Sequence, residues 1–146
     1  IYNYYESKAD LLSDTIESIW HEIFFHPEDE QVFHDVESCI SWIYERLEYG
    51  NRQFPGFFSL HSFGFMRDEK TSGKKRMMKT WGHILNGLCE VLGNDPKVRA
   101  DVFDQEFTEK KFADILFSLI LVSMIRQDYD PSSVLMLVTS LFSGLS

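Results

Sequence analysis

The apolar side chains of this chain recur every three to four residues along almost its whole length, which is the spacing of an amphipathic α-helix. No stretch shows the sustained alternation of apolar and polar residues that is typical of a half-buried strand. Proline residues separate the helical stretches at Pro27, Pro55, Pro96 and Pro131. The length of 146 residues corresponds to about one domain, so we expect an all-α helical bundle.

The pattern predicts where the helices begin and end. The expected helices span residues 7–25, 28–49, 54–65, 75–92 and 108–127, and a last one is opened by Asp130, Pro131 and Ser132. Acidic residues at 28–30 crowd the first turn of the second helix, where the helix dipole favours them, and Gly50 is a suitable stop. Residues 67–75 are polar and predict an exposed turn, and residues 97–105 predict a linker or a short helix.

The last two predicted helices are apolar on most of their faces. Such a helix needs cover on more than one side, and in a domain this small the second cover can come from another copy of the chain. We therefore expect these helices to pair with those of a second chain in a four-helix bundle. The alternative is a central core helix inside a monomer. The residues expected at the dimer interface are Phe112, Ile115, Leu119, Val122, Val134, Leu137, Val138, Leu141 and Leu145.

Composition excludes several classes of protein. The net charge of −9 argues against DNA binding by bulk charge, because neutralising phosphates requires clustered Lys and Arg. Two cysteines, Cys39 and Cys89, cannot build a disulfide scaffold or a four-thiolate zinc site. The longest apolar run, 115–125, is far shorter than the roughly 20 residues that cross a bilayer. We expect a cytoplasmic protein with no membrane partner.

No pattern in the chain predicts catalysis or metal binding. The histidines form neither an HExxH motif nor a cluster with cysteine at ligand spacing, so no metal or cofactor is expected. No GxSxG, GxGxxG or phosphate-binding loop is present. Ser59, His61 and Asp68 lie on one short segment with nothing to orient them as a triad. We therefore expect that the chain is not an enzyme.

The chain opens with IYNYYESKADLL. This segment contains, in order, an apolar residue (Ile1), a tyrosine (Tyr2), a second aromatic residue (Tyr5), a Ser-Lys pair (Ser7 and Lys8) and a Leu-Leu pair (Leu11 and Leu12). This pattern resembles the end of the DNA-reading domain of TetR-family transcriptional regulators. Tyr5 stands where Phe is usual in that family, and Ala9 stands where Glu or Asp is frequent.

The layout that follows is also similar to that family, in which one helix leads into a helical effector-binding domain that ends in two dimerisation helices. The resemblance implies that residues 1–6 end a helix-turn-helix domain and that residues 7–146 form the effector-binding and dimerisation domain. It implies that on the order of 40 residues of DNA-reading structure precede Ile1. The acidic charge would then belong to the effector domain alone.

Four residues near the start are implied to contact DNA: Tyr2, Asn3, Tyr4 and Lys8. The N–H groups at the start of the first helix can meet a phosphate, and Lys8 adds a positive charge. The tyrosine hydroxyls can donate to phosphate, and Asn3 can reach a base edge or the backbone. The alternative is that Tyr2 and Tyr5 are core aromatics and that Lys8 is solvated.

The resemblance also implies a small apolar or aromatic ligand between the helices, since ligand pockets are mostly apolar with a few orienting polar groups. Ordinary core packing is the alternative for each aromatic residue. The residues expected to line the pocket are Trp20, Phe24, Trp42, Phe58, His61, Phe63, Trp81 and Leu85, with Tyr44, His83 and Asn86 as further polar candidates.

Together with the helix layout, the resemblance implies a ligand-responsive transcriptional regulator, expected to be a repressor, in which the ligand changes the affinity of a homodimer for its operator. Two alternatives belong to other classes. One is a helical homodimer that recruits a protein and has no small ligand, against which a large dry cavity would count. The other is a small α-helical enzyme or cofactor carrier, which a metal, haem or convergent buried polar groups would favour.

Overall fold

A computed structural model describes residues 8–24, 33, 35–58 and 72–143, and it describes the side chains of these residues except at 8–13 and 72–80. The helices of this part are α1 (Lys8–Phe24), α2 (Val36–Gln53), α4 (Ser72–Asn94), α5 (Glu109–Arg126) and α6 (Ser132–Ser143). No strand occurs among the described residues. The predicted all-α fold class is therefore confirmed.

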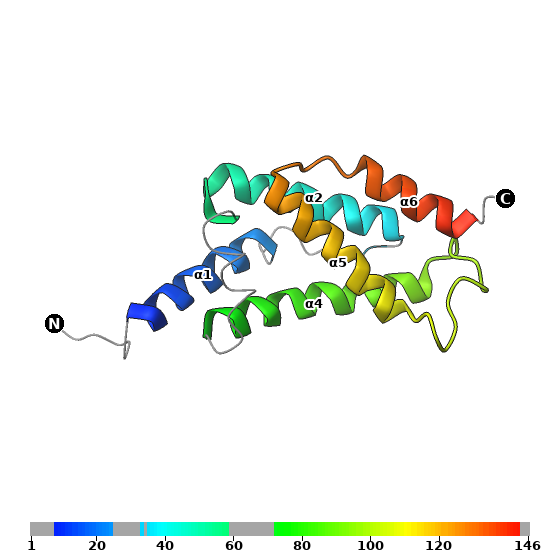
Figure 1. Cartoon of the computed structure of the whole chain (residues 1–146), viewed down its shortest axis with the longest axis horizontal. Helices are drawn as coiled ribbons and strands as arrows, with labels where there is room; N and C mark the ends of the chain where they lie inside the picture. The colour runs from blue at the N-terminus through cyan, green and yellow to red at the C-terminus, as the bar shows by residue number, and fades with distance from the viewer. Residues whose placement is uncertain (1–7, 25–32, 34, 59–71, 144–146) are drawn as a thin grey trace.

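The helices pack in two layers around one core (Figure 1). Helix α4 is the centre of the packing, because it makes the most extensive contacts with α1 and with α5 and also touches α2. Helix α5 crosses the molecule between α2 and α4, and α6 lies along α2 (Figure 1). The Thr139 hydroxyl of α6 donates to the Glu37 carboxylate of α2 at 3.0 Å.

Trp20, near the end of α1, is the hub of the core. Its side chain is completely buried, and its ring lies 5.4 to 5.9 Å from four other aromatic rings, measured between centroids. Those rings belong to Phe24, Phe57, Phe58 and Trp81. Aromatic pairs at this separation contribute beyond their buried area. This cluster joins α1, α4 and the chain that follows α2.

Helix α2 begins later than the sequence predicts, so the expected start at residue 28 is wrong. Asp35 is the N-cap, and its side chain accepts from the Ser38 N–H at 2.7 Å. Hydrogen bonding from the Ser38 side chain, and then from this N–H group, lowers the pKa of the Asp35 carboxyl. The buried carboxylate of Asp95, from the loop after α4, accepts the Val36 N–H at 3.0 Å and the Lys97 N–H at 2.9 Å. The start of α2 is thus set by two caps, one of them distant in sequence.

The end of α2 also differs from the prediction, because the helix continues through Gly50 to Gln53. Gly50 is buried where α1 and α2 cross, and a Cβ there would lie 2.7 Å from Ile23 Cδ1. Pro55 and Gly56 then turn the chain, with Gly56 at φ 82° and the Phe57 N–H bonded to the Phe54 carbonyl at 3.0 Å. The rest of the helix expected at 54–65 lies outside the described residues.

We expect Gly50→Ala to destabilise the protein by about 1–2 kcal/mol, although alanine is the better helix former. The added methyl group would press on Ile23 Cδ1 and Cγ1, at 2.7 and 2.9 Å. Gly82→Ala is the matched control, because nothing lies within 4 Å of its added Cβ, and it should gain up to about 1 kcal/mol. Urea unfolding of both variants measures the change in the free energy of unfolding. A gain in stability for both variants would contradict the close approach of α1 and α2 at Gly50.

The later helices follow the predictions more closely. Helix α4 begins at Ser72, which corrects the exposed turn expected through residue 75. Helix α5 begins and ends within one residue of the prediction, capped by Thr108 at one end and by Gln127 in the left-handed conformation at the other. Residues 97–105 form turns and bends, so they are a linker and not a helix.

Candidate functional site

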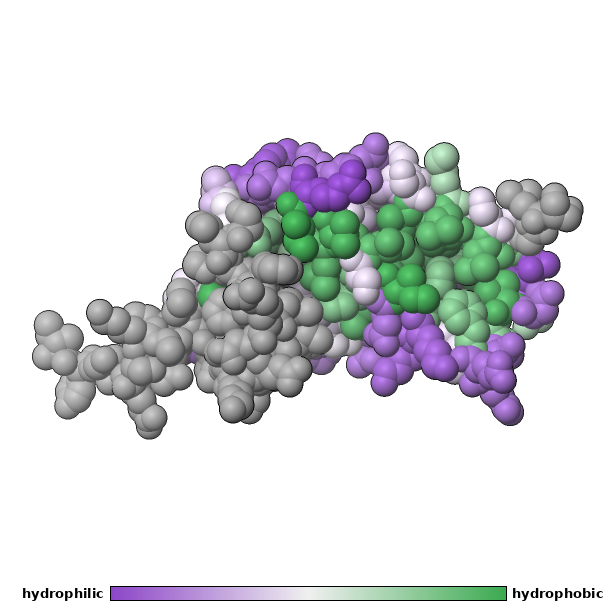
Figure 2. Space-filling model, in the orientation of Figure 1, coloured by the Kyte–Doolittle hydropathy of each residue, from purple (hydrophilic) through white to green (hydrophobic). Residues whose placement is uncertain are grey.

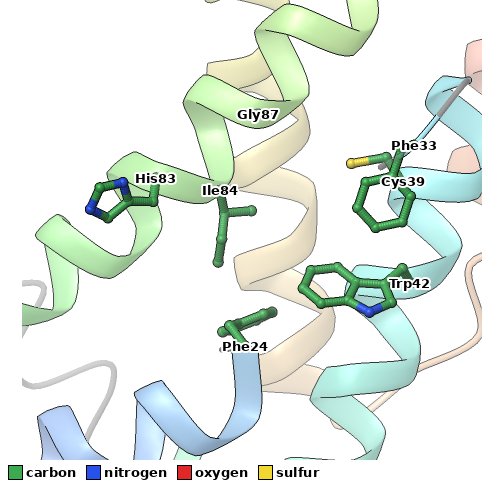
Figure 3. A pocket seen from close by; sticks show the side chains of 7 residues that line it. All are labelled: Phe24, Phe33, Cys39, Trp42, His83, Ile84 and Gly87. Carbon is green, nitrogen blue, oxygen red and sulfur yellow. The ribbon is translucent and has the colours of Figure 1, made fainter. Parts of the chain in front are cut away.

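A cavity of about 260 Å³ lies between the end of α1, the first half of α2 and the middle of α4 (Figure 3). Most of its wall is apolar. The described residues that line it are Phe24, Phe33, Cys39, Trp42, His83, Ile84 and Gly87. An apolar cavity of this kind is the usual form of a small-molecule site.

Helical spacing brings these side chains together. Cys39 and Trp42 are three residues apart on α2, as are Ile84 and Gly87 on α4, so each pair shares one helix face. Phe24 is the last residue of α1 and reaches the cavity from that helix end. Its ring centroid lies 5.9 Å from that of Trp42 and 5.2 Å from that of Trp81. The wall of the cavity therefore adjoins the aromatic core around Trp20 through Phe24.

The cavity wall carries no permanent charge among its described residues. Burial raises the pKa of the Cys39 thiol to about 12, so this group stays protonated and uncharged at neutral pH. His83 is exposed, and its ring points away from the aromatic side chains (Figure 3). The part of the chain that the structure describes holds no cluster of three or more potential metal ligands.

The structure places the sequence-predicted ligand residues in three groups. Phe24 and Trp42 line the cavity, and so does His83, one of the further polar candidates. Trp20, Phe58 and Trp81 are buried in the adjoining ring cluster, and Leu85 packs half-buried against the core. His61 and Phe63 lie outside the described residues. Sequence reasoning did not name Phe33, Cys39, Ile84 or Gly87 for this cavity, because nothing in the periodicity separates a cavity wall from ordinary core.

A guanidinium group holds the end of α1 beside the cavity. Arg46 of α2 donates from Nε to the Ile23 carbonyl at 2.5 Å and from Nη2 to the Glu22 carbonyl at 3.1 Å. A cation at the end of a helix also meets the negative pole of its dipole. The Arg46 guanidinium lies 4.3 Å from the ring centroid of Tyr49, whose hydroxyl donates to Glu22 Oε1 at 3.4 Å. These contacts fix the position of α1 one residue before Phe24.

We expect Arg46→Met to destabilise the protein by about 1–2 kcal/mol, because it removes both hydrogen bonds to the end of α1 and keeps most of the aliphatic stem. Amide hydrogen exchange in the last turn of α1 should become faster. Arg52→Met, which removes the same charge at an exposed position on α2, should change stability by less than about 0.5 kcal/mol. Equal effects of the two substitutions on urea unfolding would contradict this role of Arg46.

A second feature is an exposed apolar face on α5 and α6. Figure 2 shows hydrophobic surface running across the region where these two helices lie in Figure 1. Helix α6 contains no charged residue, and α5 has none between Asp114 and Arg126. The large exposed side chains of this face are Ile115, Val122, Ile125, Met136, Leu137 and Leu141. Charged residues are normally depleted where a protein surface is covered by a partner.

The predicted dimer-interface residues divide by burial. Four of them lie on the exposed apolar face: Ile115, Val122, Leu137 and Leu141. Leu119 is half-buried, and Leu145 lies outside the described residues. Phe112, Val134 and Val138 are instead buried in the core of the chain itself. These residues point inward because α5 and α6 each pack one face against α2 or α4, and these residues lie on that face.

The residues expected to contact DNA are not seen in detail. Tyr2, Asn3 and Tyr4 lie outside the described residues, and Lys8 is the first residue of α1 with its side chain not described. In the described part of the chain, no helix is long and apolar enough to cross a bilayer.

Comparisons with protein-family models, with curated proteins and with solved structures found no match to this chain.

Proposed function

We propose that the chain is the effector-binding and dimerisation domain of a ligand-responsive DNA-binding regulator that resembles the TetR family and acts as a repressor. One observation carries the proposal: α1 connects the segment that resembles the end of a DNA-reading domain to the wall of a cavity. Lys8 is the first residue of this helix, and Phe24, its last, lines the cavity. The 17 residues between these points span about 25 Å.

Dimerisation is supported by the exposed apolar face of α5 and α6. Six large apolar side chains are 36% to 65% exposed there, and the other exposed positions of α6 hold only serine and threonine. Small side chains permit close approach of a second pair of helices, and a face of this kind can pair with itself about a twofold axis. The occupant we propose is a second copy of the chain, which would complete a four-helix bundle.

The proposed mechanism is a shift between two arrangements of α1. A ligand that prefers one arrangement of Phe24 and the neighbouring core changes the position of α1 in each copy. The separation of the two DNA-reading heads changes with it. Two half-sites are about 34–36 Å apart, so a change of a few ångströms weakens binding to both at once.

The cavity favours this proposal over the alternative of a homodimer that recruits a protein without a small ligand. A space of about 260 Å³ lined by aromatic rings has no role in that alternative. The exposed apolar face would serve either function equally.

The test is fluorescence anisotropy of the full-length natural protein on the DNA that flanks its own gene, over a series of salt concentrations. We expect tight binding that falls steeply with salt and that discriminates this DNA from a scrambled sequence. The double substitution Tyr2→Phe, Lys8→Ala should weaken binding and leave the dimer intact. Weak binding that is equal on both DNAs would overturn the proposal.

A further inference from the structure

The chemistry of the cavity wall restricts what can bind there. One side is aromatic, formed by Phe24, Trp42 and Phe33, with ring centroids of Phe33 and Trp42 5.3 Å apart. The other side is α4, which contributes the aliphatic chain of Ile84 and the backbone of Gly87 (Figure 3). Aromatic rings bind another ring favourably by stacked or edge-to-face contact. A planar aromatic molecule therefore suits the space between these two sides.

The wall also disfavours a charged ligand. Its described residues include no Asp, Glu, Lys or Arg that could pair with an ion. The indole nitrogen of Trp42 lies on the edge of the ring away from Ile84, and His83 points outward (Figure 3). An ion that moves from water into such surroundings loses hydration and gains no ion pair from these side chains. The bound molecule should be uncharged and should need no hydrogen bond from these side chains.

The volume sets the size of the ligand. At the packing density of protein interiors, about 0.74, a cavity of about 260 Å³ accommodates roughly ten to fourteen non-hydrogen atoms. Two fused or linked aromatic rings have this size.

We infer that the cavity binds an uncharged, planar aromatic molecule of about two rings, held between Phe24 and Trp42 on one side and the Ile84–Gly87 face of α4 on the other. This inference deepens the proposed function, on which it rests for the statement that the molecule is the effector. Binding itself does not require DNA, so the two can be tested separately.

Three naphthalene derivatives of matched shape provide the test: 2-naphthylmethanol, which is neutral, 2-naphthoate, which is anionic, and 2-naphthylmethylammonium, which is cationic. Isothermal titration calorimetry of the full-length protein should give an affinity for the alcohol at least tenfold higher than for either ion. A charged derivative that binds as tightly as the alcohol would overturn the inference.

The variant Gly87→Leu tests whether the alcohol binds in the cavity. No heavy atom lies within 4 Å of a Cβ at Gly87, so the leucine side chain can occupy the cavity without a clash at its root. It should weaken binding of the alcohol at least tenfold. Gly93→Leu is the matched control, because its added Cβ is equally free and Gly93 does not line the cavity, and it should leave binding unchanged.

A second variant protects the test against misfolding of Gly87→Leu. Trp42→Ala removes part of the aromatic side and should weaken binding of the alcohol at least fivefold, with circular dichroism reporting whether each variant is folded. Unchanged binding in the folded variants would show that the alcohol binds elsewhere and would overturn the inference. If the alcohol binds as expected but DNA affinity does not respond, the inference stands and the proposed function fails.

Discussion

We expect Leu137→Glu to convert the proposed dimer to a monomer. Leu137 is 52% exposed on α6, so the glutamate can be solvated in a single chain and should cost the fold little. In a twofold interface the same substitution places two negative charges close together, which costs several kcal/mol. The dimer dissociation constant should rise by about 100-fold or more. Sedimentation velocity over a concentration series measures this change.

Ala100→Glu is the matched control for charge, because Ala100 is exposed in the loop between α4 and α5 and lies outside the apolar face. It should leave the dimer intact. Val122→Glu, on α5, should act in the same way as Leu137→Glu, since both helices contribute to the proposed interface. A wild-type protein that is monomeric at tens of micromolar would contradict the dimer, and so would a Leu137→Glu variant that remains dimeric.

Trp20→Ala should have the largest effect on stability, a loss of about 3–5 kcal/mol. Its side chain is 0% exposed and contacts four aromatic rings that come from α1, α4 and the segment after α2. This loss is a large part of the 5–15 kcal/mol that is typical of a domain. Trp20→Phe is the milder variant if the alanine variant does not fold.

Trp42→Ala is the comparison, because Trp42 is only half-buried at the cavity. This variant should lose about 1 kcal/mol of unfolding free energy. Urea unfolding monitored by circular dichroism gives both values. Equal losses for the two tryptophans would contradict the assignment of Trp20 as the hub of the core and of Trp42 as part of a cavity wall.

The sequence predicted those helices whose ends are determined by neighbouring residues. Helix α5 is the best case, because Thr108 and Gln127 are within the local sequence and cap it directly. The predicted start of α2 was wrong, because the acidic residues at 28–30 suggested the first turn of a helix. The helix begins at Val36, where Asp95 supplies a cap from 59 residues further along the chain. Periodicity carries no information about a contact of that kind.

The end of α2 and the cavity show the same limit. Gly50 predicted a stop, but the helix continues through it to Gln53, and its missing side chain lets Ile23 of α1 approach α2 closely. Phe24 and Trp42 were named for a ligand because they are aromatic, yet the same reasoning named Trp20 and Trp81, which are completely buried. Which aromatic residues face a cavity depends on how the helices cross, and a sequence pattern does not determine that.

The central claim is that the cavity and the DNA-reading heads are coupled through α1. Coupling between two sites is reciprocal, so a ligand that weakens DNA binding by some factor must itself bind more weakly by the same factor when DNA is present. The most direct measurement is the affinity of the full-length protein for the DNA flanking its gene, with and without saturating 2-naphthylmethanol, together with the affinity for the alcohol with and without that DNA. The account predicts equal factors of about 5-fold to 150-fold in the two directions. An alcohol that occupies the cavity and leaves DNA affinity unchanged would contradict it.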